Sequence, residues 1–218
     1  MHRAAWPLLC ALLIVASGVL WLAGVAGHVD PPRWMWQYEQ WRALPWTLWT
    51  APLLHFLWPH LLANALALAA LAVLGTALQA TRRDALALFL AWPLGTLALK
   101  AWPAIGGFYG LSGVVHAAAA IVAVRALATP SARWLGLLLG GGLAIKLALE
   151  RGWQVPVGFD SAWGFNVVFA AHFASAVAGA LLAITFALLG PRRRRGAESA
   201  NGRAPRVSVP DSFTAPPD

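Results

Sequence analysis

The sequence is poor in charged residues and in cysteine. Charged side chains make up 11% of its 218 residues and hydrophobic residues 60%, with a mean hydropathy of +0.65. Soluble domains carry roughly 25% charged residues, so this composition excludes an ordinary soluble domain and indicates a membrane protein. The single cysteine, Cys10, excludes an intramolecular disulfide and a cluster of thiolate metal ligands.

The sequence also lacks the alternation of polar and apolar residues that is typical of membrane barrel strands. Its apolar runs are continuous and rich in Ala and Leu, and as helices they are long enough to cross a hydrocarbon core of about 30 Å. We therefore predict an all-α membrane protein, a bundle of six transmembrane helices. The predicted spans are roughly 5–27, 52–78, 84–102, 107–128, 132–150 and 165–189.

We expect one membrane domain over residues 1–190 and a tail over residues 191–218. The first span resembles a signal peptide in its basic start, but its apolar length of about 20 residues exceeds the usual 7 to 15, which favours a retained helix. The tail is rich in Arg, Pro, Ser and Gly, and is expected to be disordered because it has little apolar surface to bury.

Basic residues predict the orientation of the six-span bundle. The loops and ends on one side of it carry Arg3, Arg82, Arg83, Arg125, Arg133 and Arg192–Arg195, whereas the loops on the opposite side carry a mixture of basic and acidic residues. The side with these arginines should be cytoplasmic, with both termini, in a bacterial-type inner (cell) membrane. Orientation and attraction to anionic lipid account for the net charge of +8, so no nucleic-acid partner is expected.

The loop after the first span is dense in tryptophan. It holds six between Arg33 and Trp58, at positions 34, 36, 41, 46, 49 and 58. Tryptophan prefers the membrane-water boundary, so the cluster is either a simple anchor belt or a structured segment lying in the outer leaflet. We expect a membrane-interfacial first loop.

Several polar residues lie within the predicted spans, where they are costly and by default functional. They are His55, His60, Asn64, Ser112, His116, Lys146, Glu150, His172 and Ser175. Spans 2, 4 and 6 run inward, which places His60, Ser112 and His172 at one depth, roughly 7 to 12 Å below the outer surface. A lone membrane serine usually bonds its own helix, and a lone histidine often bridges helices, but convergence at one depth favours chemistry.

Serine becomes a nucleophile when a base takes its proton, and imidazole is the usual base. His172 and His116 are the two candidates for Ser112. His116 lies one turn below Ser112 on the same helix and leans toward it as a packing neighbour, so a base on another helix approaches the hydroxyl more freely.

An oxyanion formed at Ser112 also needs hydrogen-bond donors. His60 and Asn64 share one face of span 2, and the Ser112 backbone N–H near a helix start is a further donor. Gly110 and Gly113 permit close helix packing. None of the eight acidic residues lies in the outer third of spans 2, 4 or 6, so we predict a serine–histidine dyad without a carboxylate.

These residues resemble the rhomboid family of intramembrane serine proteases. The resemblance rests on HLLAN at His60–Asn64, GLSG at Gly110–Gly113 and AHFASAVAG around His172, in this order, and covers about residues 35 to 190. It implies a six-span rhomboid-like bundle, Ser112 as nucleophile, His172 as general base and His60, Asn64 and the Ser112 amide as oxyanion donors. It implies no metal and no cofactor.

Within that family, GLSGVVHA is similar to the rhombosortase branch, in which a histidine follows the nucleophile by four positions. His116 would then pack against His172. The branch implies a membrane-anchored protein substrate with a C-terminal Gly-Gly sorting tail, cleaved near the outer face of the lipid bilayer. Ser175 departs from the glycine often found three residues after the base.

Two other kinds of protein fit parts of the pattern. A haem-binding membrane cytochrome would take axial ligands from His55, His60, His116 or His172, but it leaves the serine without a role. An inactive rhomboid-like binder of membrane helices, or a small transporter with Lys146 and Glu150 as an ion pair, would need no nucleophile. A haem spectrum and labelling by a fluorophosphonate probe discriminate between them.

Overall fold

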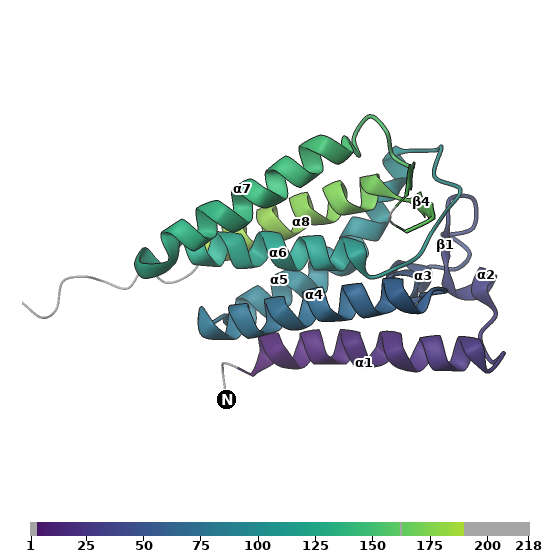
Figure 1. The fold of residues 1–218 in the computed structure, drawn as a ribbon, viewed down its shortest axis with the longest axis horizontal. Helices are drawn as coiled ribbons and strands as arrows, with labels where there is room; N and C mark the ends of the chain where they lie inside the picture. Colours follow the sequence, from purple (N-terminus) through teal and green to yellow (C-terminus); the bar gives the residue numbers. More distant parts are fainter. Residues whose placement is uncertain (1–3, 162, 190–218) are drawn as a thin grey trace, which may run out of the picture.

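The computed structural model describes residues 4–161 and 163–189, a bundle of long helices lying side by side (Figure 1). Short helices and strands gather at one end of the bundle. The predicted disordered tail, residues 191–218, lies outside the described residues, as do Arg3 and Arg192–Arg195.

Six longer helices form the bundle. Their bounds are α1 Ala5–Val25, α4 Trp58–Ala77, α5 Arg82–Ala98, α6 Ser112–Leu127, α7 Arg133–Glu150 and α8 Phe169–Leu188. Three single 3₁₀ turns, η1 Ala51–Leu53, η2 Leu99–Ala101 and η3 Pro130–Ala132, flank them. Within the described ranges, five helical segments are long and apolar enough to cross a membrane, and α6, with 16 residues, is shorter. The mostly helical membrane architecture is confirmed, whereas a crossing by α6 stays a prediction.

Three helices begin later than their apolar runs. The sixth span, predicted from residue 165, begins with strand β4 (Phe165–Val167), and α8 starts only at Phe169. Residues 52–57, predicted in span 2, form part of η1 and an irregular segment before α4. Residues 107–111, predicted in span 4, include strand β2 (Gly107–Phe108) and Gly110, whose φ of +105° is incompatible with a right-handed helix. The predicted starts were wrong because hydropathy does not distinguish a buried extended segment from a buried helix.

Basic residues cluster at the end of the bundle opposite the strands. Arg82 and Arg83 begin α5, Arg125 lies in the last turn of α6 and Arg133 begins α7 (Figure 1). Arg125 also ties two helices together, because its guanidinium donates to the carbonyls of Leu78 and Gln79 after α4. The strand end also carries basic residues, but these are mixed with acidic ones: Arg33, Arg42, Lys100 and Arg151 lie there with Asp30, Glu39 and Asp160. The excess of positive charge at the opposite end agrees with the predicted topology, and the orientation itself stays a prediction.

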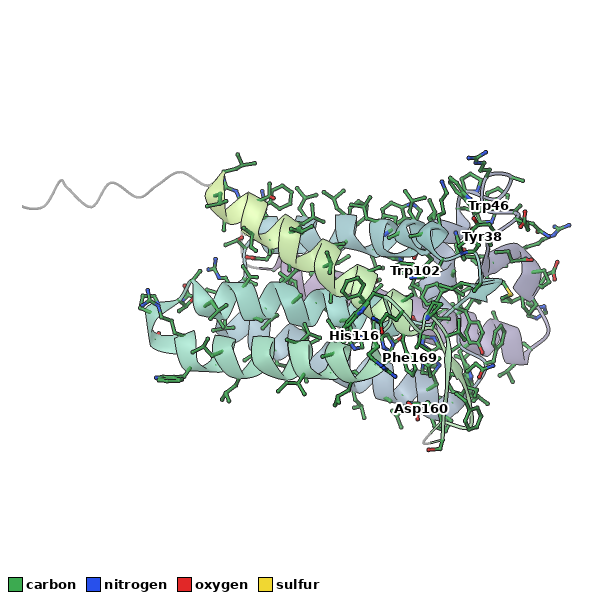
Figure 2. All side chains as sticks on the ribbon, turned by 90° about the horizontal axis from the view of Figure 1, so that it is seen from above. Tyr38, Trp46, Trp102, His116, Asp160 and Phe169 are labelled. Atoms are coloured by element: carbon green, nitrogen blue, oxygen red, sulfur yellow. The ribbon has the colours of Figure 1, made fainter. Side chains whose placement is uncertain are left out.

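The tryptophan-rich loop has a defined structure. It contains the helical turns α2 (Pro31–Trp34) and α3 (Thr47–Thr50) and strand β1 (Trp36–Gln37). Strand β1 pairs antiparallel with β2, with Trp36 opposite Phe108, and Trp36 is fully buried. The Trp46 Nε1–H donates to the Arg33 carbonyl, and Trp46 and Tyr38 lie at the loop end of the bundle (Figure 2). Of the two alternatives that the sequence left open, a structured segment is the one observed, and its place at the membrane interface stays a prediction.

A second small sheet precedes α8. Strands β3 (Gly158–Asp160) and β4 (Phe165–Val167) form an antiparallel hairpin at the same end of the bundle as β1 and β2. The chain therefore enters both α6 and α8 from extended segments at that end.

Helices α6 and α8 approach closely because small residues line their contact. A Cβ at Gly179 of α8 would lie 2.6 Å from the backbone oxygen of Ala117 of α6. Ala117 and Ala118 are fully buried. No side chain can therefore be added at Gly179 unless one helix moves.

We expect Gly179→Ala to destabilise the protein by roughly 1–3 kcal/mol, because the added methyl group must displace backbone atoms of α6. The matched control is Gly141→Ala in α7, where an added Cβ meets nothing within 4 Å. Thermal unfolding in detergent, followed by circular dichroism, measures both. Equal unfolding midpoints for the two variants would contradict the tight contact.

Candidate active site

Ser112 and His172 form a hydrogen-bonded pair between α6 and α8. Ser112 is the first residue of α6, and His172 is the fourth residue of α8. The Ser112 hydroxyl lies 3.0 Å from His172 Nε2. A serine hydroxyl beside an imidazole nitrogen is the arrangement in which the nitrogen can remove the hydroxyl proton.

His116 supports this pair and does not compete for the hydroxyl. Its ring is stacked on that of His172, with centroids 4.1 Å apart and planes 10° apart. His116 Nδ1 lies 2.7 Å from the Ser112 carbonyl oxygen, to which it donates one turn back along α6. The sequence favoured His172 over His116 as the base, and in the structure His172 Nε2 lies against the hydroxyl whereas His116 bonds to the Ser112 carbonyl.

A carboxylate reaches His172, which the sequence analysis did not foresee. Glu150, the last residue of α7, accepts a hydrogen bond from His172 Nδ1 at 2.9 Å. Lys146, one turn earlier on α7, donates to the other oxygen of the same carboxylate, as the i, i+4 spacing predicted. The prediction that no acidic residue reaches the pair was wrong, because only spans 2, 4 and 6 were considered.

Three of these groups have the composition of a metal site. His116, Glu150 and His172 place one potential ligand atom each within 4.8 Å of one another. Their hydrogen bonds to Ser112 and between Glu150 and His172 account for this proximity. We therefore assign no metal to them.

The two glycines that flank Leu111 and Ser112 have different tasks. A Cβ at Gly110 would lie 2.9 Å from the His60 ring, and the residue has a positive φ, so the turn into α6 requires glycine. A Cβ at Gly113 would lie 2.9 Å from Ser175 Oγ on α8. Gly113 therefore lets α8 approach α6 one residue after Ser112, as the small-residue pattern predicted.

His60 and Asn64 line the same cavity as the serine and both stacked histidines. This cavity, of about 480 Å³, is bounded by α4, α6, α7 and the β3–β4 hairpin, and it also contains Lys146 and Glu150. A second cavity, of about 220 Å³, shares His60 and Ser112 with the first. Ser112 thus lines both cavities.

The predicted positions of the site residues along their helices need correction, whereas their depth in the membrane stays a prediction. His60, Ser112 and His172 are the third, first and fourth residues of their helices. They therefore lie within about 5 Å of the helix starts at 1.5 Å per residue. All three lie in the first turns of their helices and line one cavity, nearer the helix starts than predicted. Figure 2 shows His116 and Phe169 toward the same end of the bundle.

His55 anchors the segment that precedes Ser112. Its Nδ1 donates to the Leu53 carbonyl, which leaves Nε2 as an acceptor for the Leu111 N–H at 3.3 Å and for Asn64 Nδ2 at 3.2 Å. Burial is the main cause, and repulsion from His60 a smaller one, that lowers the pKa of His55 to about 4. The neutral ring therefore holds Leu111 and Asn64 at once.

The contacts of His55 with Leu111 and of Glu150 with His172 were not predicted from the sequence, although His55 and Glu150 stand out in it as polar groups. His55 precedes the HLLAN motif by five residues, in a segment wrongly assigned to helix, so its direction was not predictable. Glu150 carried a usable signal. In the predicted topology, span 5 ends at the outer surface, where spans 4 and 6 begin. Its last residue, Glu150, is therefore level with the first residues of spans 4 and 6.

Comparison with known proteins adds one match. The family model described as the Rhomboid domain matches residues 42–188, which includes the helices α4 to α8 and every site residue described above. A search of curated proteins found no match.

The low pKa of His55 predicts a loss of stability in acid. The unfolded chain binds a proton at His55 below about pH 6.5, whereas the folded chain resists protonation down to about pH 4. The free energy of unfolding should therefore fall by up to about 3 kcal/mol as the pH drops through this window. Thermal midpoints at about pH 7.5 and pH 5 measure the fall.

His55→Gln is the comparison for this prediction, because a glutamine oxygen can accept from the Leu111 N–H without titrating. The variant should lose less stability than the wild type between the two pH values. Identical falls in both proteins would show that His55 does not contribute.

Proposed function

Because the chain belongs to the rhomboid family, we propose that it is an intramembrane serine protease with Ser112 as nucleophile and His172 as general base. The observation that carries this proposal is the 3.0 Å contact between Ser112 Oγ and His172 Nε2 at the edge of the 480 Å³ cavity. The membrane helices around it supply a site that a membrane-anchored substrate can reach.

The proposed reaction has two halves. In the first, Ser112 Oγ bonds to the scissile carbonyl carbon while its proton moves to His172 Nε2, and that proton then passes to the amide nitrogen as the C–N bond breaks. In the second, water attacks the resulting ester and His172 takes its proton. Collapse of this intermediate returns the proton to Ser112 and releases a carboxylate.

The oxyanion of each half is assigned to three donors. Ser112 begins α6, so its backbone N–H has no partner within the helix and lies at the positive end of the helix dipole. Asn64 and His60 line the cavity beside it. His55 already holds one N–H of Asn64, which fixes the orientation of the amide. Fixed donors cost no reorganisation when the charge develops.

His116 is assigned a supporting role. Its stacked ring covers one face of His172, and its bond to the Ser112 carbonyl fixes it to the first turn of α6. The His116 ring therefore holds the His172 ring level with the Ser112 hydroxyl.

The proposed substrate is a membrane-anchored protein whose helix unwinds near the outer face, since a peptide bond within an intact helix is not free for attack. The GLSGVVHA sequence favours the rhombosortase branch and hence a C-terminal Gly-Gly sorting tail. Arg82, Arg83, Arg125 and Arg133 lie at the end of the bundle opposite the site, which supports a site that opens to the outer side.

The haem alternative fits the geometry less well. The rings of His116 and His172 lie face to face at 4.1 Å, which leaves no space for a porphyrin between them. Both nitrogens of His172 and both of His55 are engaged in hydrogen bonds within the chain. An inactive binder of helices would retain none of the chemistry tested next.

Ser112→Ala should abolish cleavage of a co-expressed substrate with a Gly-Gly tail, a transmembrane helix and a basic cluster, because the nucleophile is lost. Ser131→Ala, an exposed serine of η3 at the opposite end, is the matched control and should cleave like the wild type. Immunoblotting of the released outer portion measures both. Cleavage by Ser112→Ala would overturn the proposal.

The mass of the released product tests the second half of the reaction. We expect a new C-terminus that carries a free carboxylate, because water resolves the ester. A product with added mass would instead indicate transfer of the acyl group to an amine, and would contradict hydrolysis.

A further inference from the structure

We propose that Glu150 is a positioning residue for His172, so that the site works as a serine–histidine–glutamate triad. The inference rests on the proposed function, because it assigns a role to a residue that acts through the general base. Glu150 Oε2 lies 2.9 Å from His172 Nδ1, and His172 Nε2 lies 3.0 Å from Ser112 Oγ. The two ring nitrogens therefore contact the carboxylate and the nucleophile separately.

The carboxylate selects one tautomer of His172. An ionised carboxylate only accepts hydrogen bonds, so Nδ1 must carry the proton. Nε2 then has a free lone pair, which is the form that can take the proton of Ser112. When it does, the positive imidazolium lies against the negative carboxylate, which stabilises the charge without itself taking a proton.

Contacts of the backbone around Glu150 also help to place its carboxylate beside His172. Helix α7 ends at Glu150 because Arg151 adopts a left-handed conformation with φ of 48°. Gly152 follows, and a Cβ there would lie 2.3 Å from the Phe169 carbonyl oxygen, at the start of α8. The Trp102 indole N–H donates to the Trp153 carbonyl at 3.2 Å and holds the turn from the other side.

Lys146 pairs with the carboxylate and helps to hold it in place. Its Nζ binds Glu150 Oε1, while Oε2 faces His172, so the two oxygens have different partners. The Lys146 side chain is half exposed, and that of Glu150 is 12% exposed, so the carboxylate is the more enclosed partner. Ionisable groups from other elements share the cavity with His172, namely His60 of α4, His116 of α6 and Asp160 of β3.

A purely structural ion pair would tie α7 to α8 and do nothing else. The two roles differ in what they predict for Glu150→Gln, which keeps the size of the side chain. Glutamine lacks the charge, and its amide can donate to Nδ1 and so favour the wrong tautomer. A positioning role therefore predicts a slower reaction in a protein that is still folded.

The test uses full-length protein in liposomes and a fluorophosphonate probe that reacts with an activated serine. Glu150→Gln should lower the maximal rate of labelling about 100-fold or more with little change in the probe concentration at half-maximal rate, since general-base catalysis contributes about 10²–10⁴-fold. Glu150→Asp should recover part of that rate because it restores the carboxylate. Glu39→Gln, an exposed glutamate of the first loop, is the matched control and should label like the wild type.

A spectroscopic measurement keeps the inference testable if Glu150→Gln is unstable. In ¹⁵N-histidine spectra of the wild-type protein, with His172 assigned by its loss in His172→Gln, His172 should carry its proton on Nδ1. A proton on Nε2 would overturn the inference without any variant at Glu150.

The outcomes separate this inference from the proposed function. Labelling that persists in Ser112→Ala overturns the proposed function, and the role of Glu150 with it. Labelling that requires Ser112 but proceeds at the wild-type rate in Glu150→Gln overturns the role of Glu150 alone. Slow labelling of Glu150→Gln with an unchanged thermal midpoint, together with partial recovery of the labelling rate in Glu150→Asp, supports the positioning role of Glu150.

Discussion

The close backbone approach of α6 and α8 is the constraint on which the rest of the site depends. Gly113 and Gly179 leave no room for a side chain at their contacts, and alanines fill the space between the helices. The hydrogen bond between Ser112 and His172 forms only because the two helices meet there. In a membrane, where apolar surface alone does not drive helices together, such tight packing supplies much of the attraction.

The loops fix the start of α6, which is one of the two helices of this pair. Gly110 N–H donates to the Ala51 carbonyl, Leu111 N–H donates to His55, and β2 pairs with the tryptophan-rich loop at β1. The loops and the helix pair thus define the position of one hydroxyl from two directions. Polar groups in a membrane are costly unless they are paired, which explains why His55 and His172 each use both ring nitrogens in hydrogen bonds.

Much of the site could be predicted from the sequence because polar residues stand out in apolar spans. The pairing of Ser112 with His172, and the packing of His116 on His172, both followed from order, spacing and family resemblance. Glu150 was missed because only the outer thirds of spans 2, 4 and 6 were considered for a carboxylate, and Glu150 ends span 5. Helix starts were misplaced because Gly110 and the segment before α4 are apolar yet not helical.

The sequence by itself determined that this chain is a helical membrane protein with a serine and histidines near one surface. Composition and apolar run length suffice for that, because a bilayer imposes them on any spanning helix. Only the tertiary structure decided which nitrogen meets which oxygen, and that Glu150 lies behind His172. Those contacts depend on differences of about one turn in helix starts and on side-chain direction, and neither leaves a periodic signal in the sequence.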